Sequence, residues 1–154
     1  MRLFALFILV LTLRAQPAQP LPFSHKQHAG ALKLACKMCH PNPDPGETMT
    51  IAKPAACMQC HSTVKTESPH IQKLAEAAKS GRDIPWVRIY GIPGFVFFSH
   101  RAHLEKGNTC DECHGDVASR DQLSVERDLS MGGCQKCHTA TKAGLDCGYC
   151  HEPR

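Results

Sequence analysis

Aromatic side chains are scarce in this chain of 154 residues, where six Phe, two Tyr and one Trp make up only 6%. Large aromatic groups supply much of the area buried in an ordinary core, so this chain has little with which to build one. Its 42% hydrophobic content and ten cysteines nevertheless exclude a disordered chain. Eleven Pro and eleven Gly disfavour a long helical bundle. We therefore expect something other than side-chain burial to organise the fold.

Long apolar runs are also lacking, except for residues 3–13 near the N-terminus. This run has the length of the apolar region of a secretory signal peptide and is too short to span a bilayer. We predict a signal peptide over residues 1–15, cleaved after Ala15 or Ala18, with an uncleaved anchor as the alternative. The exported protein would then work in a bacterial periplasm, soluble or peripherally associated with the inner membrane. No membrane span is expected after the signal is removed.

A strong excess of one charge is missing as well. Eighteen Lys and Arg against fourteen Asp and Glu give a formal charge of +4. Nucleic-acid-binding domains carry a much stronger, clustered basic charge. The sequence therefore predicts no nucleic-acid partner.

The ten cysteines fall into five copies of one pattern, Cys-x-x-Cys-His, and none lies outside it. This pattern is typical of c-type haem attachment. Two thiols three positions apart share one side of a helical turn and form thioethers with the two vinyl groups of one haem, while the adjacent histidine binds the iron. A disulfide framework, zinc ribbons and a thioredoxin-like site fit less well, because none needs a histidine after every second cysteine. The sequence predicts five covalently bound haem c groups (iron).

The five motifs are numbered in chain order. The predicted attachment residues are Cys36, Cys39, Cys57, Cys60, Cys110, Cys113, Cys134, Cys137, Cys147 and Cys150. The predicted proximal iron ligands are His40, His61, His114, His138 and His151.

Five further histidines are available for the opposite faces of the irons. Four of them lie in residues 23–28 and 98–103, which share the pattern Phe-Ser-His-x-x-His, and each segment shortly precedes a haem motif. Histidines three residues apart share a helix face, and neutral imidazole is a good iron ligand. We interpret them as distal ligands, not as ordinary surface pairs. These residues are His25, His28, His100 and His103.

The fifth distal ligand has two candidates. Met131 precedes Cys134 by three residues, and the two intervening glycines allow its thioether to fold back over the haem it precedes. His70 follows Ser68 and Pro69, a typical helix start, where a histidine can simply be solvated. We favour Met131; His70, or an open or water-ligated iron, is the alternative. Met/His ligation raises the potential of a haem relative to His/His.

The repeated segment also organises the chain. We predict a two-haem half over residues 21–66, a linker over 67–94 and a three-haem half over 95–154. In the linker, apolar spacing over 68–81 predicts an amphipathic helix whose stripe packs into the core. Residues 86–90 and 95–98 predict two short strands. The expected fold class is mostly irregular, with short α-helices and a small β-hairpin, organised around five covalently bound haems.

The Phe-Ser-His-x-x-His segment followed by Cys-x-x-Cys-His resembles the class III multihaem cytochromes (cytochromes c3 and c7), and the second half resembles a c7 unit. This resemblance implies that the first histidine of each pair serves the haem attached just downstream. It assigns His25 to the first motif and His28 to the second. It likewise assigns His100 to the third motif and His103 to the fifth.

Further segments, beginning at Ser68, Pro85, Phe95 and Leu129, are similar to the pentahaem cytochrome subunit of membrane menaquinol-oxidising complexes (alternative complex III and the related quinone reductase complex). The last of these, Leu-Ser-Met-Gly-Gly-Cys, contains Met131 and is a second reason to favour that ligand. The similarity implies redox proteins, or a membrane quinol oxidoreductase complex, as partners.

These observations predict a periplasmic pentahaem cytochrome that carries electrons between a quinol-side or cytochrome donor and a downstream acceptor. One alternative is the haem subunit of a membrane-associated quinol oxidoreductase. A less favoured one is a multihaem reductase with one open iron. All five motifs end in histidine, so the lysine-ligated catalytic motif of some multihaem reductases is absent. We expect an electron-transfer protein with no catalytic residues of its own.

Overall fold

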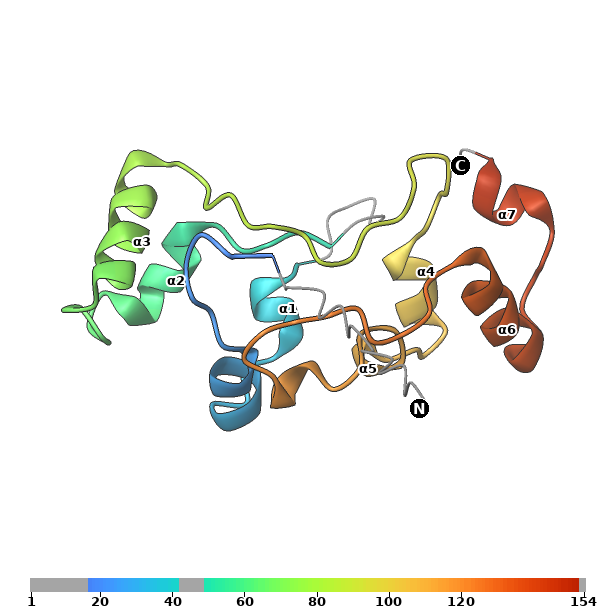
Figure 1. The fold of residues 1–154 in the computed structure, drawn as a ribbon, viewed down its shortest axis with the longest axis horizontal. Coiled ribbons are helices and arrows are strands. Elements are labelled where there is room, and N and C mark those ends of the chain that lie inside the picture. Colours follow the sequence, from blue (N-terminus) through green and yellow to red (C-terminus); the bar gives the residue numbers. More distant parts are fainter. Residues whose placement is uncertain (1–16, 42–48, 153–154) are drawn as a thin grey trace, which may run out of the picture.

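The computed structural model describes residues 17–41 and 49–152, so the signal peptide predicted over residues 1–15 lies outside them. The described part is an elongated arrangement of short helices joined by long irregular segments (Figure 1). No helix of this part is long and apolar enough to cross a membrane. In chain order the helices are η1 (Lys26–Ala31), α1 (Cys36–Cys39), α2 (Pro54–His61), α3 (Pro69–Ser80), α4 (His100–Glu105), α5 (Cys110–His114), η2 (Val117–Ser119), α6 (Met131–Thr141) and α7 (Cys147–His151).

Each Cys-x-x-Cys-His motif forms a helical turn. Helices α1, α5 and α7 begin at the first cysteine of a motif, while α2 ends on the histidine of the second motif and α6 contains the fourth. Residues three apart on a helix lie on the same face, so each turn places its two thiols side by side. All ten cysteines are free of disulfides, as thioether formation requires.

Helix α3 confirms the helix predicted over residues 68–81. Ser68 is its N-cap and Pro69 its first residue, and Gly81 ends it in the left-handed region at φ 67°, where glycine carries no Cβ penalty. Leu74 and Ala77 on α3 are buried, and α2 packs beside α3 (Figure 1). The apolar stripe of this helix is therefore core.

Little else is buried. Within residues 17–41 and 49–152, the buried apolar side chains are Leu21, Leu74 and Ala77, together with Pro54. A single domain of this size normally buries most of its large apolar side chains. The polypeptide alone thus supplies only a fragment of a core, as its shortage of aromatic residues predicts.

The predicted β-hairpin is wrong, because the described chain contains no strand and residues 86–90 and 95–98 are irregular. In each segment one backbone N–H group bonds to a distant partner, and the two segments form no ladder with each other. The Val87 N–H donates to Oε1 of Gln19 at 3.0 Å, and the Phe97 N–H donates to the carbonyl of Cys150 at 2.7 Å. A strand requires a partner ladder, and these segments use their donors to hold other parts of the chain.

The two predicted halves are joined where η1 lies against η2. The Lys26 N–H donates to the carbonyl of Arg120 at 2.8 Å, and the Ser24 hydroxyl donates to Asp121. Gly30 comes so close to the carbonyl of Ala118 that a Cβ at this glycine would lie 2.3 Å from that oxygen. Close backbone approach therefore brings the first histidine pair next to the third haem motif.

We expect Gly30→Ala to lower the stability of the haem-loaded protein by about 1–3 kcal/mol, the usual cost of overpacking, because its Cβ would meet a backbone oxygen that cannot swing aside. The measurement is thermal unfolding followed by circular dichroism. Gly91→Ala is the matched control, since nothing lies within 4 Å of a Cβ there. Equal melting temperatures for the two variants would contradict this role of Gly30.

Candidate functional site

The first Phe-Ser-His-x-x-His segment is ordered by its phenylalanine and serine. The Phe23 ring stacks on His28 with ring centres 4.4 Å apart and meets His25 edge-on at 4.9 Å. Nδ1 of His28 lies 2.8 Å from the carbonyl oxygen of Ser24. One aromatic ring and one backbone carbonyl therefore orient both imidazoles.

The second segment repeats this arrangement 75 residues later. Phe98 stacks on His103 at 4.5 Å and meets His100 edge-on at 4.8 Å, and Nδ1 of His103 lies 2.8 Å from the carbonyl oxygen of Ser99. The phenylalanine and the serine had no role among the residues predicted from the sequence. Their recurrence in both segments was the signal that could have identified them as positioning residues.

Each of these four histidines faces the histidine of a haem motif. The ring-centre separations and angles between ring planes are 6.3 Å and 7° for His25 with His40, 6.1 Å and 52° for His28 with His61, 6.4 Å and 6° for His100 with His114, and 6.0 Å and 48° for His103 with His138. Each segment thus contributes one parallel pair and one tilted pair. The internal repeat of the sequence is also a repeat of pair geometry.

These separations fit a haem iron. A metal–imidazole bond is about 2.0–2.1 Å long and the ring centre lies about 1 Å beyond the bound nitrogen, so two imidazoles on opposite faces of one iron have centres roughly 6 Å apart. The four observed separations lie at this value. The gap between the rings is therefore the thickness that one iron atom between two nitrogens requires.

Hydrogen bonds select the nitrogen that would face the iron. A histidine whose Nδ1–H donates to a carbonyl keeps Nε2 as its free ligand atom. Four motif histidines have Nδ1 within hydrogen-bond distance of a backbone carbonyl oxygen: His40 to Thr50 at 3.1 Å, His61 to Val64 at 3.1 Å, His138 to Gly144 at 2.7 Å and His151 to Phe95 at 3.2 Å. These contacts fix the tautomer suited to a haem iron.

The electrostatics also favour neutral imidazoles. Burial, followed by the charges of His40, His28 and Arg120, lowers the pKa of His25 to about 4. Burial and then the charge of His100 lower the pKa of His114, with smaller contributions from His40 and Arg120. Only the neutral ring can donate a lone pair to a metal, so these surroundings favour the protonation state in which His25 and His114 can bind a metal.

Three of the pairs are those that the family resemblance implies, and one differs. His103 faces His138 of the fourth motif, not the fifth motif to which the resemblance assigned it. That position is also the one predicted for Met131, whose thioether was expected to fold over the fourth haem. The two glycines after Met131 do not form a flexible turn but belong to α6, with the Ser130 hydroxyl accepting from the Gly133 N–H at 3.3 Å.

The cysteines show which motifs are neighbours. Burial, and then the charge of a cysteine in another motif, raises the pKa of four thiols. These are Cys57 beside Cys39, Cys110 beside Cys36, Cys113 beside Cys137 and Cys134, and Cys134 beside Cys150. In space the motifs therefore follow the order second, first, third, fourth, fifth. Figure 1 shows the same row, with α2 on the left, α1 and α5 in the middle, and α6 and α7 on the right.

The fifth motif lacks a histidine partner of this kind in the described part of the chain. The ring that lies against His151 is Phe95, at 6.0 Å. His70 is exposed near the start of α3, at the opposite end of the molecule from α7 (Figure 1). Met131 begins α6, which lies with α7 at the right-hand end of the same view (Figure 1). Of the two candidates, Met131 is the one at the same end as His151.

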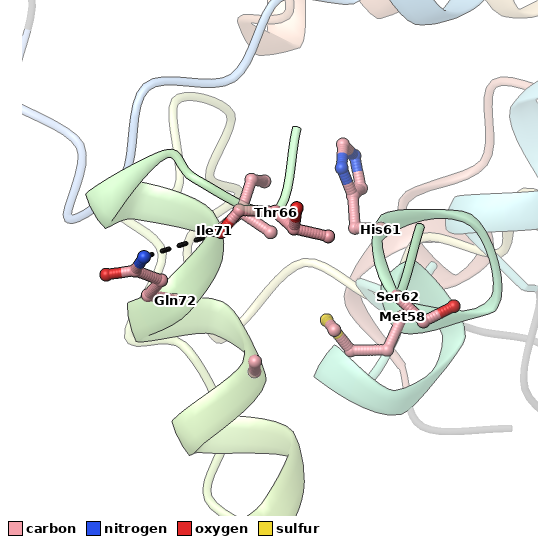
Figure 2. A pocket seen from close by; sticks show the side chains of 7 residues that line it. Met58, His61, Ser62, Thr66, Ile71 and Gln72 are labelled. Carbon is pink, nitrogen blue, oxygen red and sulfur yellow. Dashed lines mark hydrogen bonds between the residues drawn. The ribbon is translucent and has the colours of Figure 1, made fainter. Parts of the chain in front are cut away.

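A hollow of about 190 Å³ lies between α2 and α3, beside His61 of the second motif, and Figure 2 shows the side chains that line it. Met58 and Ser62 of the α2 side and Ile71 of α3 also line it. Small-molecule sites are usually about 300–1,000 Å³. This hollow is smaller than that range, and it lies directly against a motif histidine.

The chain is similar to known multihaem cytochromes. Residues 12–84 match the family model described as "Class III cytochrome C family", and residues 96–153 match "Cytochrome c7 and related cytochrome c". The chain is 30% identical over 167 aligned positions to "Menaquinone reductase, multiheme cytochrome c subunit" from Nitratidesulfovibrio vulgaris, and the alignment covers 91% of this chain and 80% of that relative.

Proposed function

Because this chain belongs to the class III multihaem c-type cytochromes, we propose that it carries electrons through five covalently attached haem c groups in a bacterial periplasm. The four histidine pairs about 6 Å apart carry this proposal. Haem attached by thioethers and held by two axial ligands has no free site for a substrate. Held by these residues, haem iron would supply one-electron transfer between its ferric and ferrous forms, in which no bond forms or breaks.

The row of motifs supports a linear path. Neighbouring motifs bring their cysteines close enough for their charges to interact, so adjacent haems would lie close together. The second and fifth motifs are at the two ends of the row. We infer that electrons enter and leave there, from a reduced quinol-side centre or cytochrome at one end to an oxidised redox protein at the other.

We assign the axial ligands from the same geometry. The haems of the first to fourth motifs would take the histidine pairs described above. The fifth haem would take His151 and Met131. The position of α6 at the same end of the molecule as α7 (Figure 1) and the interaction between Cys134 and Cys150 support this assignment, because both place α6 near the fifth motif.

A test of the proposal is the haem content. Produced in a host that attaches haem c, the protein should carry five haems per chain, counted by pyridine haemochrome and by the mass of the denatured protein. Replacing Cys57 and Cys60 by Ala should reduce the count to four, because both thioethers of the second haem are lost. A count of four or fewer in the unaltered chain would overturn the five-haem proposal.

The likeness to the menaquinone reductase subunit favours a second candidate, in which the same electron transfer takes place within a membrane quinone oxidoreductase complex. Extraction of the native membrane with mild detergent distinguishes the two. Purification in a stable complex with other subunits would support the complex. Recovery as a monomer in the soluble periplasmic fraction would support a free carrier.

A further inference from the structure

Arg120 lies at the junction between the first and third motifs. Its guanidinium donates to the carbonyl of His114 at 2.7 Å and to that of Asp116 at 2.9 Å. Its own carbonyl accepts from the N–H of Lys26 at 2.8 Å, the residue after His25. One side chain and its backbone thus connect a proposed ligand of the first haem to a proposed ligand of the third.

The guanidinium is largely withdrawn from solvent. The Arg120 side chain is 16% exposed, and its ion-pair partner Glu126 is 39% exposed. Gly115 leaves room for this pair, because a Cβ there would lie 2.6 Å from a carboxylate oxygen of Glu126. The Tyr90 hydroxyl donates to the carbonyl of Ser124 at 2.9 Å, and the Tyr90 ring meets His114 edge-on at 4.5 Å. A charge pair whose guanidinium is shielded and whose carboxylate reaches solvent is therefore built into the space beside the third motif.

The charge of the Arg120 guanidinium acts on the first and the third motif. Coulomb interactions weaken much less in a shielded site than in water. A positive charge near an iron favours the ferrous over the ferric form and so raises its reduction potential, whereas a carboxylate does the opposite.

We propose that the Arg120–Glu126 pair sets the reduction potentials of the haems of the first and third motifs, which meet at the junction of the two halves and are termed the central haems. The inference rests on the proposed function, since it requires haem at both motifs. Arg120 raises both potentials, and Glu126 moderates that effect. The pair would thus control how readily an electron crosses from one half of the row to the other.

The test follows each haem separately by NMR of its methyl resonances while the haem-loaded protein is reduced stepwise. Arg120→Gln should lower the potentials of the two central haems, and Glu126→Gln should raise the same two by a smaller amount. Arg120→Lys keeps the charge and should retain most of the unaltered potentials. Arg82→Gln is the matched control, because Arg82 forms an exposed ion pair with Glu76 on α3, and it should shift none.

Opposite signs for the two variants at the same two haems are the decisive result. Shifts of the same sign, equal shifts at all five haems, or an Arg120→Lys variant as altered as Arg120→Gln would overturn the proposal. If the Arg120→Gln variant does not acquire its haems, Glu126→Gln still shows whether the reduction potentials of these two haems rise or fall as proposed. Absence of haem from the first or third motif would contradict the proposed function instead, whereas bound haems with unmoved potentials would contradict only this inference.

Discussion

Without attached haem, the chain is expected to show little helix by far-ultraviolet circular dichroism and no cooperative unfolding transition. Leu21, Leu74, Ala77 and Pro54 are the apolar side chains that are buried among the described residues. A fully buried Leu contributes roughly 1.5–3 kcal/mol, whereas ordering the backbone costs about 1–2 kcal/mol for every residue. Most of its helices are shorter than the dozen or so residues that an isolated helix needs to be even marginally stable.

The measurement compares the same chain produced with and without a haem-attachment system. The haem-loaded form should unfold cooperatively, and the haem-free form should resemble a chain in denaturant over the whole temperature range. Dithiothreitol is kept in both samples so that disulfides between the free thiols do not confuse the comparison. A sharp thermal transition in the haem-free chain would show that the polypeptide core suffices and would contradict a fold that depends on its haems.

Met131→Ala is expected to convert one of the five haems from low spin to high spin and to abolish the near-infrared charge-transfer band of a Met-ligated ferric haem. The thioether supplies the sixth ligand in our assignment, and alanine cannot replace it. Met131→His should restore a low-spin iron with a lower potential, because His/His ligation lowers the potential relative to Met/His. Low-temperature EPR and near-infrared magnetic circular dichroism measure both effects.

Two variants complete this experiment. Met49→Ala removes a thioether outside all five motifs and should leave the spectra unchanged. His70→Ala should do the same, since α3 lies at the opposite end of the molecule from α7 (Figure 1). If His70→Ala produces the high-spin haem while Met131→Ala does not, the alternative ligand is correct. A high-spin haem already present in the unaltered protein would indicate an open iron.

The sequence predicted the parts of this protein that depend on neighbouring residues. A Cys-x-x-Cys-His motif carries its own chemistry within five residues, so attachment sites could be recognised without knowing the fold. The capped helix over residues 68–81 was equally local, with Ser68, Pro69 and Gly81 at its ends. The paired histidines of residues 23–28 and 98–103 were found because the pattern occurs twice.

The strands at residues 86–90 and 95–98 show where local patterns fail. Their β-branched and aromatic residues favour extended backbone, and the backbone there is irregular and without strand. Whether an extended segment becomes a strand depends on the partner that its N–H groups find. In this chain Val87 bonds to Gln19 and Phe97 to Cys150, which no local pattern could indicate.

The sequence by itself determined the five contiguous motifs and the two histidine pairs, and with them the residues that we propose attach haem and ligate iron. Only the tertiary structure decided which of them meet. His103 faces the fourth motif and not the fifth, and the second motif lies at one end of the row. The tertiary structure also placed Arg120 between the first and third motifs. Contacts of this kind depend on how segments far apart in the sequence pack together. The close approach of Gly30 to Ala118, for example, produces no periodic pattern in the sequence that could predict it.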